Sequence, residues 1–277
     1  MAIKLVAIDI DGTLITDQLT ITPATKAAIQ SATKQGVKVV LCTGRPMTGV
    51  SSYLDQLEIS GLQDEYVISF NGGLVQNTAG DPLAEFVIQF DDMIDLGSFA
   101  LKQGLHMVVE TSHHIHSINR QISPFSTNES NLVSLPLQYS SLDALADCRQ
   151  GLTISKLMFT DDAHLIDQAI NDLPEELANR FNIVRSEPYY LEFVNPKASK
   201  GSALKLLGEE LGIQADEMMA LGNAQNDESM LEFAGLGVAM ENSIPSTLAI
   251  ADAVTASNND DGVAKAIEKY VLQALCQ

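Results

Sequence analysis

Short apolar runs that alternate with helix-like segments are the feature that most constrains this chain. The runs are rich in β-branched residues and short enough to form buried parallel strands. Thr22-Pro23 opens the first helix-like segment, with Thr as cap and Pro at the first position, and Gly36 closes it. Expected strands lie at 4–8, 37–42, 66–70, 218–221 and 237–240. Expected helices lie at 22–36, 46–57, 199–211, 227–233, 245–251 and 262–275. This alternation predicts an α/β fold with a doubly wound parallel sheet.

The middle of the chain follows a different pattern. Strand-like stretches at 85–90, 115–118 and 156–159 alternate in polarity, which favours an antiparallel sheet with one wet face. Helical segments are expected near 91–103 and 164–171, and the polar stretch 119–136 is expected to be a loop. We therefore predict a core at 1–82 and 189–277, interrupted by an inserted α+β lobe at 83–188.

Charge and cysteine content restrict the partners and the compartment. The formal net charge of −20 disfavours nucleic acid and anionic membranes as partners. No apolar run approaches the roughly 20 residues that a membrane helix needs. The cysteines, Cys42, Cys148 and Cys276, are odd in number and far apart, so we expect neither a disulfide framework nor a zinc site, and a cytoplasmic location.

Two carboxylates follow the first expected strand, in the segment Asp9-Ile10-Asp11-Gly12-Thr13. Ligands of open α/β sheets bind at the carboxyl ends of the strands. There, Asp9 can act as a nucleophile toward phosphorus, and Asp11 can act as general acid and then base. The alternative is a solvated turn, since Asp-Gly is common in turns.

Two further motifs follow strands of the same expected sheet. Thr43 and Gly44 follow the second strand and can hold phosphate oxygens, although this motif taken alone is more simply explained as an ordinary helix start. Lys200 opens a helix and can neutralise a phosphate, although most lysines lie at the surface.

The segment 222–227 gathers oxygen-bearing side chains suited to a hard cation: Asn223, Asn226 and Asp227. The alternative is a polar helix cap formed by Asn226 or Asp227.

The joint order of these motifs resembles the haloacid dehalogenase superfamily of phosphohydrolases. It is most similar to the Cof-type branch, sugar-phosphatase-like proteins of subclass IIB with a large inserted cap. The resemblance extends over essentially the whole chain and includes Asn71-Gly72, Asn195-Pro196 and the segment 237–242. It implies a superfamily-type Rossmann-like core, a Mg²⁺ cofactor and a small phosphorylated metabolite, such as a sugar phosphate, as substrate.

The resemblance also implies roles for individual residues. Asp9 would be nucleophile and metal ligand, and Asp11 would be the acid/base and would bind metal through its carbonyl. Asp227 would support the metal. The phosphate would be held by the Ile10 backbone N–H, Thr43, Gly44, Lys200 and Asn226. In the lobe, Arg120 and His114 are candidates for contact with the rest of the substrate.

One position departs from the family pattern. Asn223 stands where the family places an Asp that contributes charge to the magnesium site. An amide oxygen can bind the metal but brings no negative charge. We therefore expect either an active phosphatase with weaker metal binding or a module that binds a phosphorylated ligand without turnover. A phosphomutase on the same fold is a further alternative.

Overall fold

The chain forms two compact units in a computed structural model that describes residues 2–273. Unit 1 comprises the chain up to Gly44, the segment Val50–Glu85 and the chain from Ser199 onward. Unit 2 comprises Arg45–Gly49 and Phe86–Ala198. Cys276 and the end of the predicted terminal helix lie outside the described residues.

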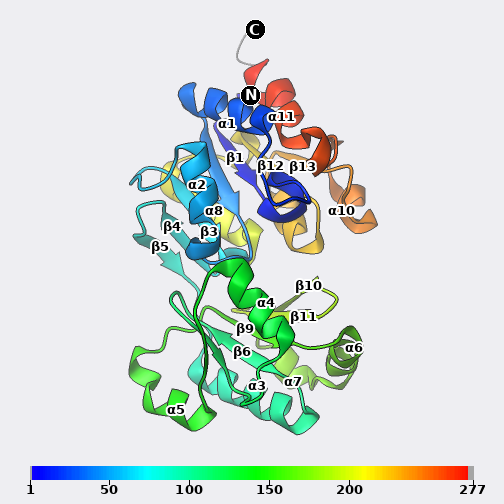
Figure 1. The fold of residues 1–277 in the computed structure, drawn as a ribbon. Coiled ribbons are helices and arrows are strands. Elements are labelled where there is room, and N and C mark those ends of the chain that lie inside the picture. Colours follow the sequence, from blue (N-terminus) through cyan, green and yellow to red (C-terminus); the bar gives the residue numbers. More distant parts are fainter. Residues whose placement is uncertain (1, 274–277) are drawn as a thin grey trace. The chain divides into compact units, whose positions relative to one another are not determined.

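Unit 1 is built on a sheet whose described strands follow the order β14-β13-β12-β1-β2-β3-β4-β5 (Figure 1). The strands from β14 to β3 are parallel, and β4 and β5 extend the sheet antiparallel at one edge. The sheet is thus mixed at that edge, where only parallel strands were predicted. The strands are β1 (Leu5–Ile8), β2 (Lys38–Cys42), β3 (Tyr66–Ser69), β4 (Leu74–Asn77), β5 (Pro82–Glu85), β12 (Met218–Gly222), β13 (Leu236–Ala239) and β14 (Ala253–Val254).

Helices cover both faces of this sheet, which confirms the doubly wound α/β fold. Leu5 and Ala7 of β1 belong to one apolar cluster with α8 and α9, whereas α1 contacts β2 and α11. Because both faces are covered, β1 is buried along its whole length, as its uninterrupted apolar sequence predicted. The helices are α1 (Pro23–Lys34), α2 (Ser51–Leu57), α8 (Lys200–Leu211), α9 (Glu228–Phe233), α10 (Pro245–Ile250) and α11 (Gly262–Ile267).

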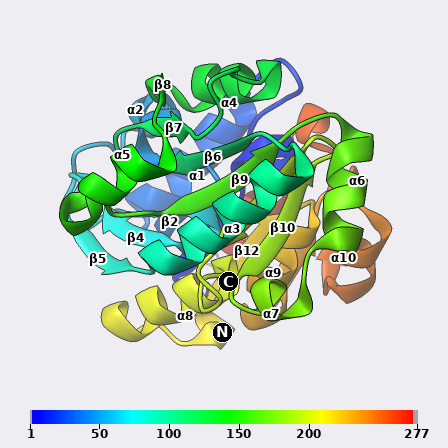
Figure 2. The same ribbon diagram turned by 90° about the horizontal axis from the view of Figure 1, so that it is seen from below.

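Unit 2 contains a second sheet, in which the strands found within residues 2–273 follow the order β10-β11-β9-β6-β7-β8. The pairs are antiparallel except β7 with β8. One face packs on α3, α5, α6 and α7, of which α3 and α6 are seen across the sheet in Figure 2, and the other packs on α4. The strands are β6 (Met107–Glu110), β7 (Ile115–Ser117), β8 (Leu137–Tyr139), β9 (Lys156–Thr160), β10 (Asn182–Glu187) and β11 (Tyr190–Val194). The helices are α3 (Phe90–Gln103), α4 (Pro124–Val133), α5 (Leu142–Asp147), α6 (Ala163–Asp172) and α7 (Glu175–Ala178).

Four predictions for the middle of the chain were wrong. The antiparallel sheet does not leave one face to solvent, because β6, β9 and β11 are buried along their whole length between helices on both faces. The second boundary lies after Ala198 and not at 188, because β11 pairs with both β9 and β10 and so belongs to unit 2. The stretch 119–136 is not a loop, since Ser123 Oγ caps α4 within it by accepting from the Phe125 N–H. The stretch 85–90 is not one strand, since β5 ends at Glu85 and α3 begins at Phe90.

No helix among residues 2–273 is long and apolar enough to cross a bilayer.

Unit 2 holds an unusual charged cluster in its interior. Lys156 Nζ lies 3.3 Å from Glu110 Oε2, 3.3 Å from Glu129 Oε1 and 3.7 Å from Glu192 Oε2, and all four side chains are buried. Burial raises the pKa of the Glu110 carboxyl to about 8, against the lowering effect of Lys156. One cation thus faces three carboxyls, of which Glu110 keeps its proton at neutral pH.

Glu110→Gln is expected to remove a pH dependence of stability. Between the ordinary pKa of about 4.5 and the folded value of about 8, the folded state holds a proton that the unfolded chain releases. Wild-type stability therefore falls as pH rises, by up to about 1.4 kcal/mol per pH unit. Urea unfolding at several pH values between 5 and 8 measures this slope. Glu176→Gln, on an exposed position of α7, should keep the wild-type slope, and an unchanged slope in Glu110→Gln would contradict the assignment.

Candidate active site

The first motif leaves the carboxyl end of β1 through a tight turn. The Asp9 N–H donates to Leu221 O of β12 at 3.0 Å, so Asp9 is still fixed to the sheet. Gly12 has a φ of +76°, and a Cβ there would lie 2.6 Å from a side-chain atom of Asn223, so both conformation and space require glycine. The turn buries the Asp9 carboxylate and leaves Asp11 exposed.

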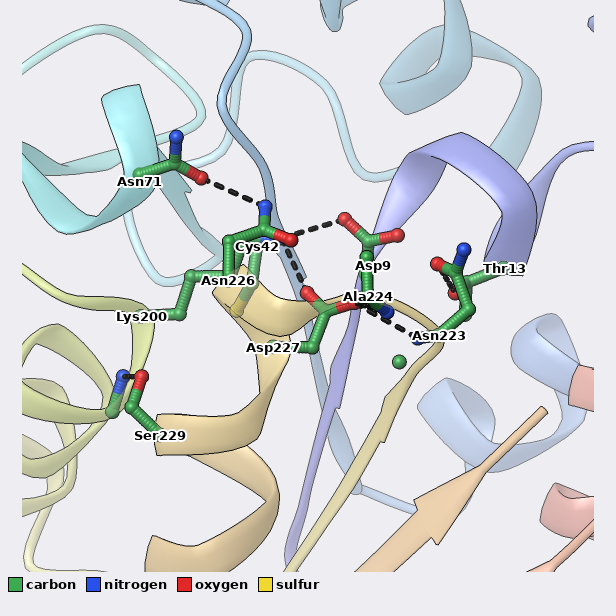
Figure 3. A network of polar contacts seen from close by, with 12 residues as sticks. Asp9, Thr13, Cys42, Asn71, Lys200, Asn223, Ala224, Asn226, Asp227 and Ser229 are labelled. Carbon is green, nitrogen blue, oxygen red and sulfur yellow. Dashed lines mark hydrogen bonds and ion pairs between the residues drawn. The ribbon is translucent and has the colours of Figure 1, made fainter. Parts of the chain in front are cut away.

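Lys200 lies between two carboxylates at this edge of the sheet (Figure 3). Its side chain is completely buried, and Nζ donates to Asp9 Oδ1 and to Asp227 Oδ1, each at 2.6 Å. Ser199 Oγ accepts from the Ser202 N–H at 3.0 Å and begins α8 at Lys200. A buried ammonium requires carboxylate partners of this kind. The structure therefore excludes the alternative that Lys200 is an ordinary surface lysine.

The charge states of Asp9 and Lys200 depend on each other and on Asp227. Burial and the neighbouring Asp227 raise the pKa of the Asp9 carboxyl to about 7, while the Lys200 ammonium lowers it. Burial favours a neutral amine at Lys200, but Asp227 and Asp9 outweigh it and hold the lysine pKa above its usual range. Lys200 therefore stays charged. A further cation beside Asp9 would favour the ionised form of the Asp9 carboxyl.

Asp227 organises the loop that follows β12. Its Oδ2 accepts from the Asn223 N–H at 2.8 Å and from the Ala224 N–H at 3.0 Å, while Oδ1 accepts from Lys200. Gly222 lets this carboxylate approach the backbone, since a Cβ at that position would collide with Asp227 Cβ. Both oxygens of Asp227 are engaged, so the arrangement favours support of a metal site over direct binding of the metal.

The predicted phosphate-binding residues Thr43 and Gly44 follow β2, next to β1 in the sheet. The Thr43 N–H donates to Ile68 O at 2.9 Å, and Thr43 O accepts from the Asn71 N–H at 2.9 Å. Asn226 Nδ2 donates to Asn71 Oδ1 at 3.0 Å (Figure 3), and a Cβ on Gly44 would lie 3.1 Å from Asn71 Nδ2. Asn71 thus connects the Thr43 loop with the β12 loop.

Asn71 was noted in the sequence only as part of a motif, without a role. Phe70, Asn71 and Gly72 have φ values of 52°, 54° and 93°, a run of left-handed backbone directly after β3. Such conformations are costly for residues other than glycine and cluster at functional sites. The Asn-Gly pair at a strand end was the available signal.

The Asn223 amide lies among the oxygens of the first motif. One of its terminal atoms is 2.9 Å from Thr13 Oγ1, 2.9 Å from Asp11 O and 3.2 Å from Asp9 Oδ2. The partners assign this atom as nitrogen, because the Asp11 carbonyl only accepts hydrogen bonds and the Asp9 carboxylate only accepts them in its ionised form. The Thr13 hydroxyl, to which the sequence assigned no role, is the third partner.

The same positions fit a magnesium ion. Adjacent ligands of an octahedral Mg²⁺ at about 2.1 Å stand about 3.0 Å apart. Asp9 Oδ2 and Asp11 O lie 3.2 and 2.9 Å from the Asn223 amide atom, so each is at the spacing of a neighbouring ligand of that atom if the amide presents its oxygen. No group of three or more His, Cys, Asp or Glu able to hold a metal occurs among residues 2–273, so the fit rests on mixed oxygen donors with few charges.

Cys42 lies directly before Thr43 but is not a second nucleophile. Its side chain is fully buried, and burial raises the pKa of the thiol to about 12. The thiol therefore stays protonated at neutral pH and acts as a small apolar side chain.

The two candidate specificity residues lie in unit 2. Arg120 is exposed, with its guanidinium carbon 5.9 Å from the centre of the Tyr139 ring. His114 is exposed, with its ring 5.9 Å from that of His116. Their contact with substrate stays a prediction.

The chain matches a known family over nearly its whole length. Residues 6–267 match the haloacid dehalogenase-like hydrolases. The chain is 42% identical over 273 residues to "Putative phosphatase M6_Spy0533" of Streptococcus pyogenes serotype M6, with 98% of this chain and 100% of that protein covered. It therefore belongs to the haloacid dehalogenase-like hydrolase family and is a phosphoric monoester hydrolase, as its motifs predicted.

Solved structures support the same fold. A haloacid dehalogenase-like hydrolase from Bacteroides thetaiotaomicron superposes with a TM-score of 0.86 at 30% identity, covering 96% of this chain and 99% of that one. The subclass IIB sugar phosphatase BT4131 superposes with a TM-score of 0.80, covering 96% and 98%, and at 22% identity this likeness concerns the fold alone. The family match and the 42% identical relative confirm the predicted resemblance to the Cof-type branch.

Proposed function

We propose that this phosphatase is Mg²⁺-dependent and transfers the phosphoryl group of a small metabolite to Asp9 and then to water. The observation that carries the proposal is the position of Asp9. Its Oδ1 lies 2.6 Å from a fully buried lysine ammonium, and its Oδ2 lies 3.2 Å from the Asn223 amide atom. One carboxylate thus stands between a fixed positive charge and positions suited to a cation, which is what attack on an anionic phosphate requires.

The two chemical steps use Asp9 and Asp11. An Asp9 oxygen attacks phosphorus, the bond from phosphorus to the leaving oxygen breaks, and Asp11 gives that oxygen its proton. Asp11 then takes a proton from a water whose oxygen attacks the aspartyl-phosphate, which releases inorganic phosphate and Asp9. The exposure of Asp11 supports this role, since its carboxyl can reach a substrate and water.

The remaining residues bind and orient. The Ile10 and Gly44 N–H groups, the Thr43 hydroxyl and the Asn226 amide would hold phosphate oxygens. Lys200 would offset their charge. Asp9, the Asp11 carbonyl and Asn223 Oδ1 would hold Mg²⁺, with Asp227 behind them. When bound, Mg²⁺ supplies positive charge against the phosphoryl oxygens.

Sugar phosphates are the proposed substrate class, by analogy with the Cof-type branch that the sequence motifs resemble. Unit 2 would serve as the cap that selects the substrate, with Arg120 and His114 as candidate contacts. We place the reaction in the cytoplasm, which is compatible with Cys42 and Cys148 being free thiols.

Hydrolysis of an aryl phosphate tests the reaction. We expect release of the phenol and inorganic phosphate with millimolar Mg²⁺ and loss of both with EDTA. A panel of phosphorylated metabolites then defines the substrate. Isomerised substrate without phosphate release would instead indicate a phosphomutase.

A ligand-binding module without turnover is the second candidate, because the Asn223 amide already fills the hydrogen-bonding positions of the cation site. Phosphate binding detected by calorimetry, together with no hydrolysis under any metal or substrate, would favour this candidate.

A further inference from the structure

The side chain of Asn223 has two ends with opposite properties. Its nitrogen end faces Asp9 Oδ2, Asp11 O and Thr13 Oγ1, so its two N–H groups can donate to oxygens at the cation site. Its other end lies over Gly12, where the missing Cβ leaves room for it. Turning the amide by half a turn exchanges nitrogen and oxygen without moving any other atom, because the two ends have nearly the same size.

The backbone that carries this amide is held independently of it. The Asn223 N–H donates to Asp227 Oδ2 at 2.8 Å, and Asn223 O accepts from the Ile244 N–H at 3.1 Å. Asp227 is in turn held by Lys200. The amide can therefore turn while the loop keeps its place.

A carboxylate at position 223 lacks this freedom. It would place a negative oxygen about where the amide nitrogen lies, 2.9 Å from Asp11 O and 3.2 Å from Asp9 Oδ2. Such an arrangement is repulsive unless a cation lies between the oxygens. The amide removes this repulsion in the metal-free protein.

We propose that Asn223 is a two-way ligand: its nitrogen end satisfies the cation site when magnesium is absent, and its oxygen end binds magnesium after the amide turns. The proposal rests on the metal site of the proposed function. It follows that magnesium binds in competition with the hydrogen bonds that the two Asn223 N–H groups donate, and that the metal-free site is already ordered. The cation then acts as a reversible activator whose occupancy follows its free concentration.

The test compares wild type with Asn223→Asp by thermal unfolding in EDTA and across a magnesium titration, with the dissociation constant measured by calorimetry. We expect a lower melting temperature than wild type in EDTA, a larger stabilisation by magnesium, and magnesium binding about tenfold tighter. Equal or higher stability of Asn223→Asp in EDTA, or unchanged magnesium affinity, would overturn the proposal.

Asn242→Asp provides a matched control. Asn242 Nδ2 donates to Gly12 O at 2.9 Å, so this variant adds the same charge beside the same turn, away from the three oxygens. It should not show the tighter magnesium binding. An increase in magnesium affinity equal to that of Asn223→Asp would mean that added negative charge alone causes the effect, and would overturn the proposal.

Side-chain amide NMR of the wild type gives a reading that does not depend on any variant folding or on activity. The Asn223 amide protons should exchange slowly with solvent in EDTA and faster with magnesium, and identical exchange in both conditions would contradict the turn. If this change and the stability pattern appear in a chain that hydrolyses nothing, the two-way ligand stands and the phosphatase proposal fails. If magnesium-dependent hydrolysis occurs without them, the two-way ligand fails alone.

Discussion

Asp9→Asn should lose hydrolysis by at least about 10⁴-fold while remaining folded, because an amide oxygen cannot form the aspartyl-phosphate. The change keeps the shape of the side chain, and an amide oxygen can still accept from Lys200 Nζ. It also removes a carboxylate whose burial raises its pKa to about 7, so stability near pH 8 should not fall. Phosphate release with magnesium and thermal unfolding at the same pH measure both effects.

Asp55→Asn, on the exposed side of α2, is the matched control and should hydrolyse like the wild type. Retention of more than about a hundredth of the wild-type rate in Asp9→Asn would remove Asp9 from the role of nucleophile. Rapid quenching of the wild type with a ³²P-labelled substrate adds a direct reading. Label should stay on the wild-type chain and be absent from Asp9→Asn.

Lys200→Met should be the most damaging change to both stability and activity. It leaves Asp9 and Asp227 buried side by side without their shared cation, a kind of loss that costs about 3–5 kcal/mol. Hydrolysis should fall by at least about 10³-fold, because the charge that faces the phosphate is gone.

The stability defect of Lys200→Met should depend on pH in one direction. Without the lysine, the buried Asp9 carboxyl favours its protonated form still more, so the folded state holds a proton that the unfolded chain releases. Stability should therefore fall further below the wild type as pH rises from about 5.5 to 8, as measured by urea unfolding. Lys205→Met, at an exposed position of α8, controls for the loss of a lysine from this helix. A defect that is equal at both pH values would argue against the ion pairs as its cause.

The inserted unit shows where local pattern was insufficient. The apolar residues of β11 fit a strand of the core as well as a strand of the insertion. Only the pairing of β11 with β9 and β10 decided the boundary. The polar segment that contains α4 has few apolar residues, and its helix depends on a Ser cap and on packing of Val133 against the sheet. The spacing of apolar residues within one segment does not show which distant segment it pairs with.

The sequence by itself determined the class of this protein. The fully apolar β1, the carboxylates after it and the Thr, Lys and Asn motifs after later strands are local features, and parallel strands bring their carboxyl ends to one edge. Only the tertiary structure decided what these side chains do to one another. Lys200 and Asp9 are separated by 191 positions and meet at 2.6 Å, and Asn223 reaches Thr13 across 210 positions. Charge state and hydrogen-bond direction depend on such contacts, because burial and neighbouring groups act through space and not along the chain.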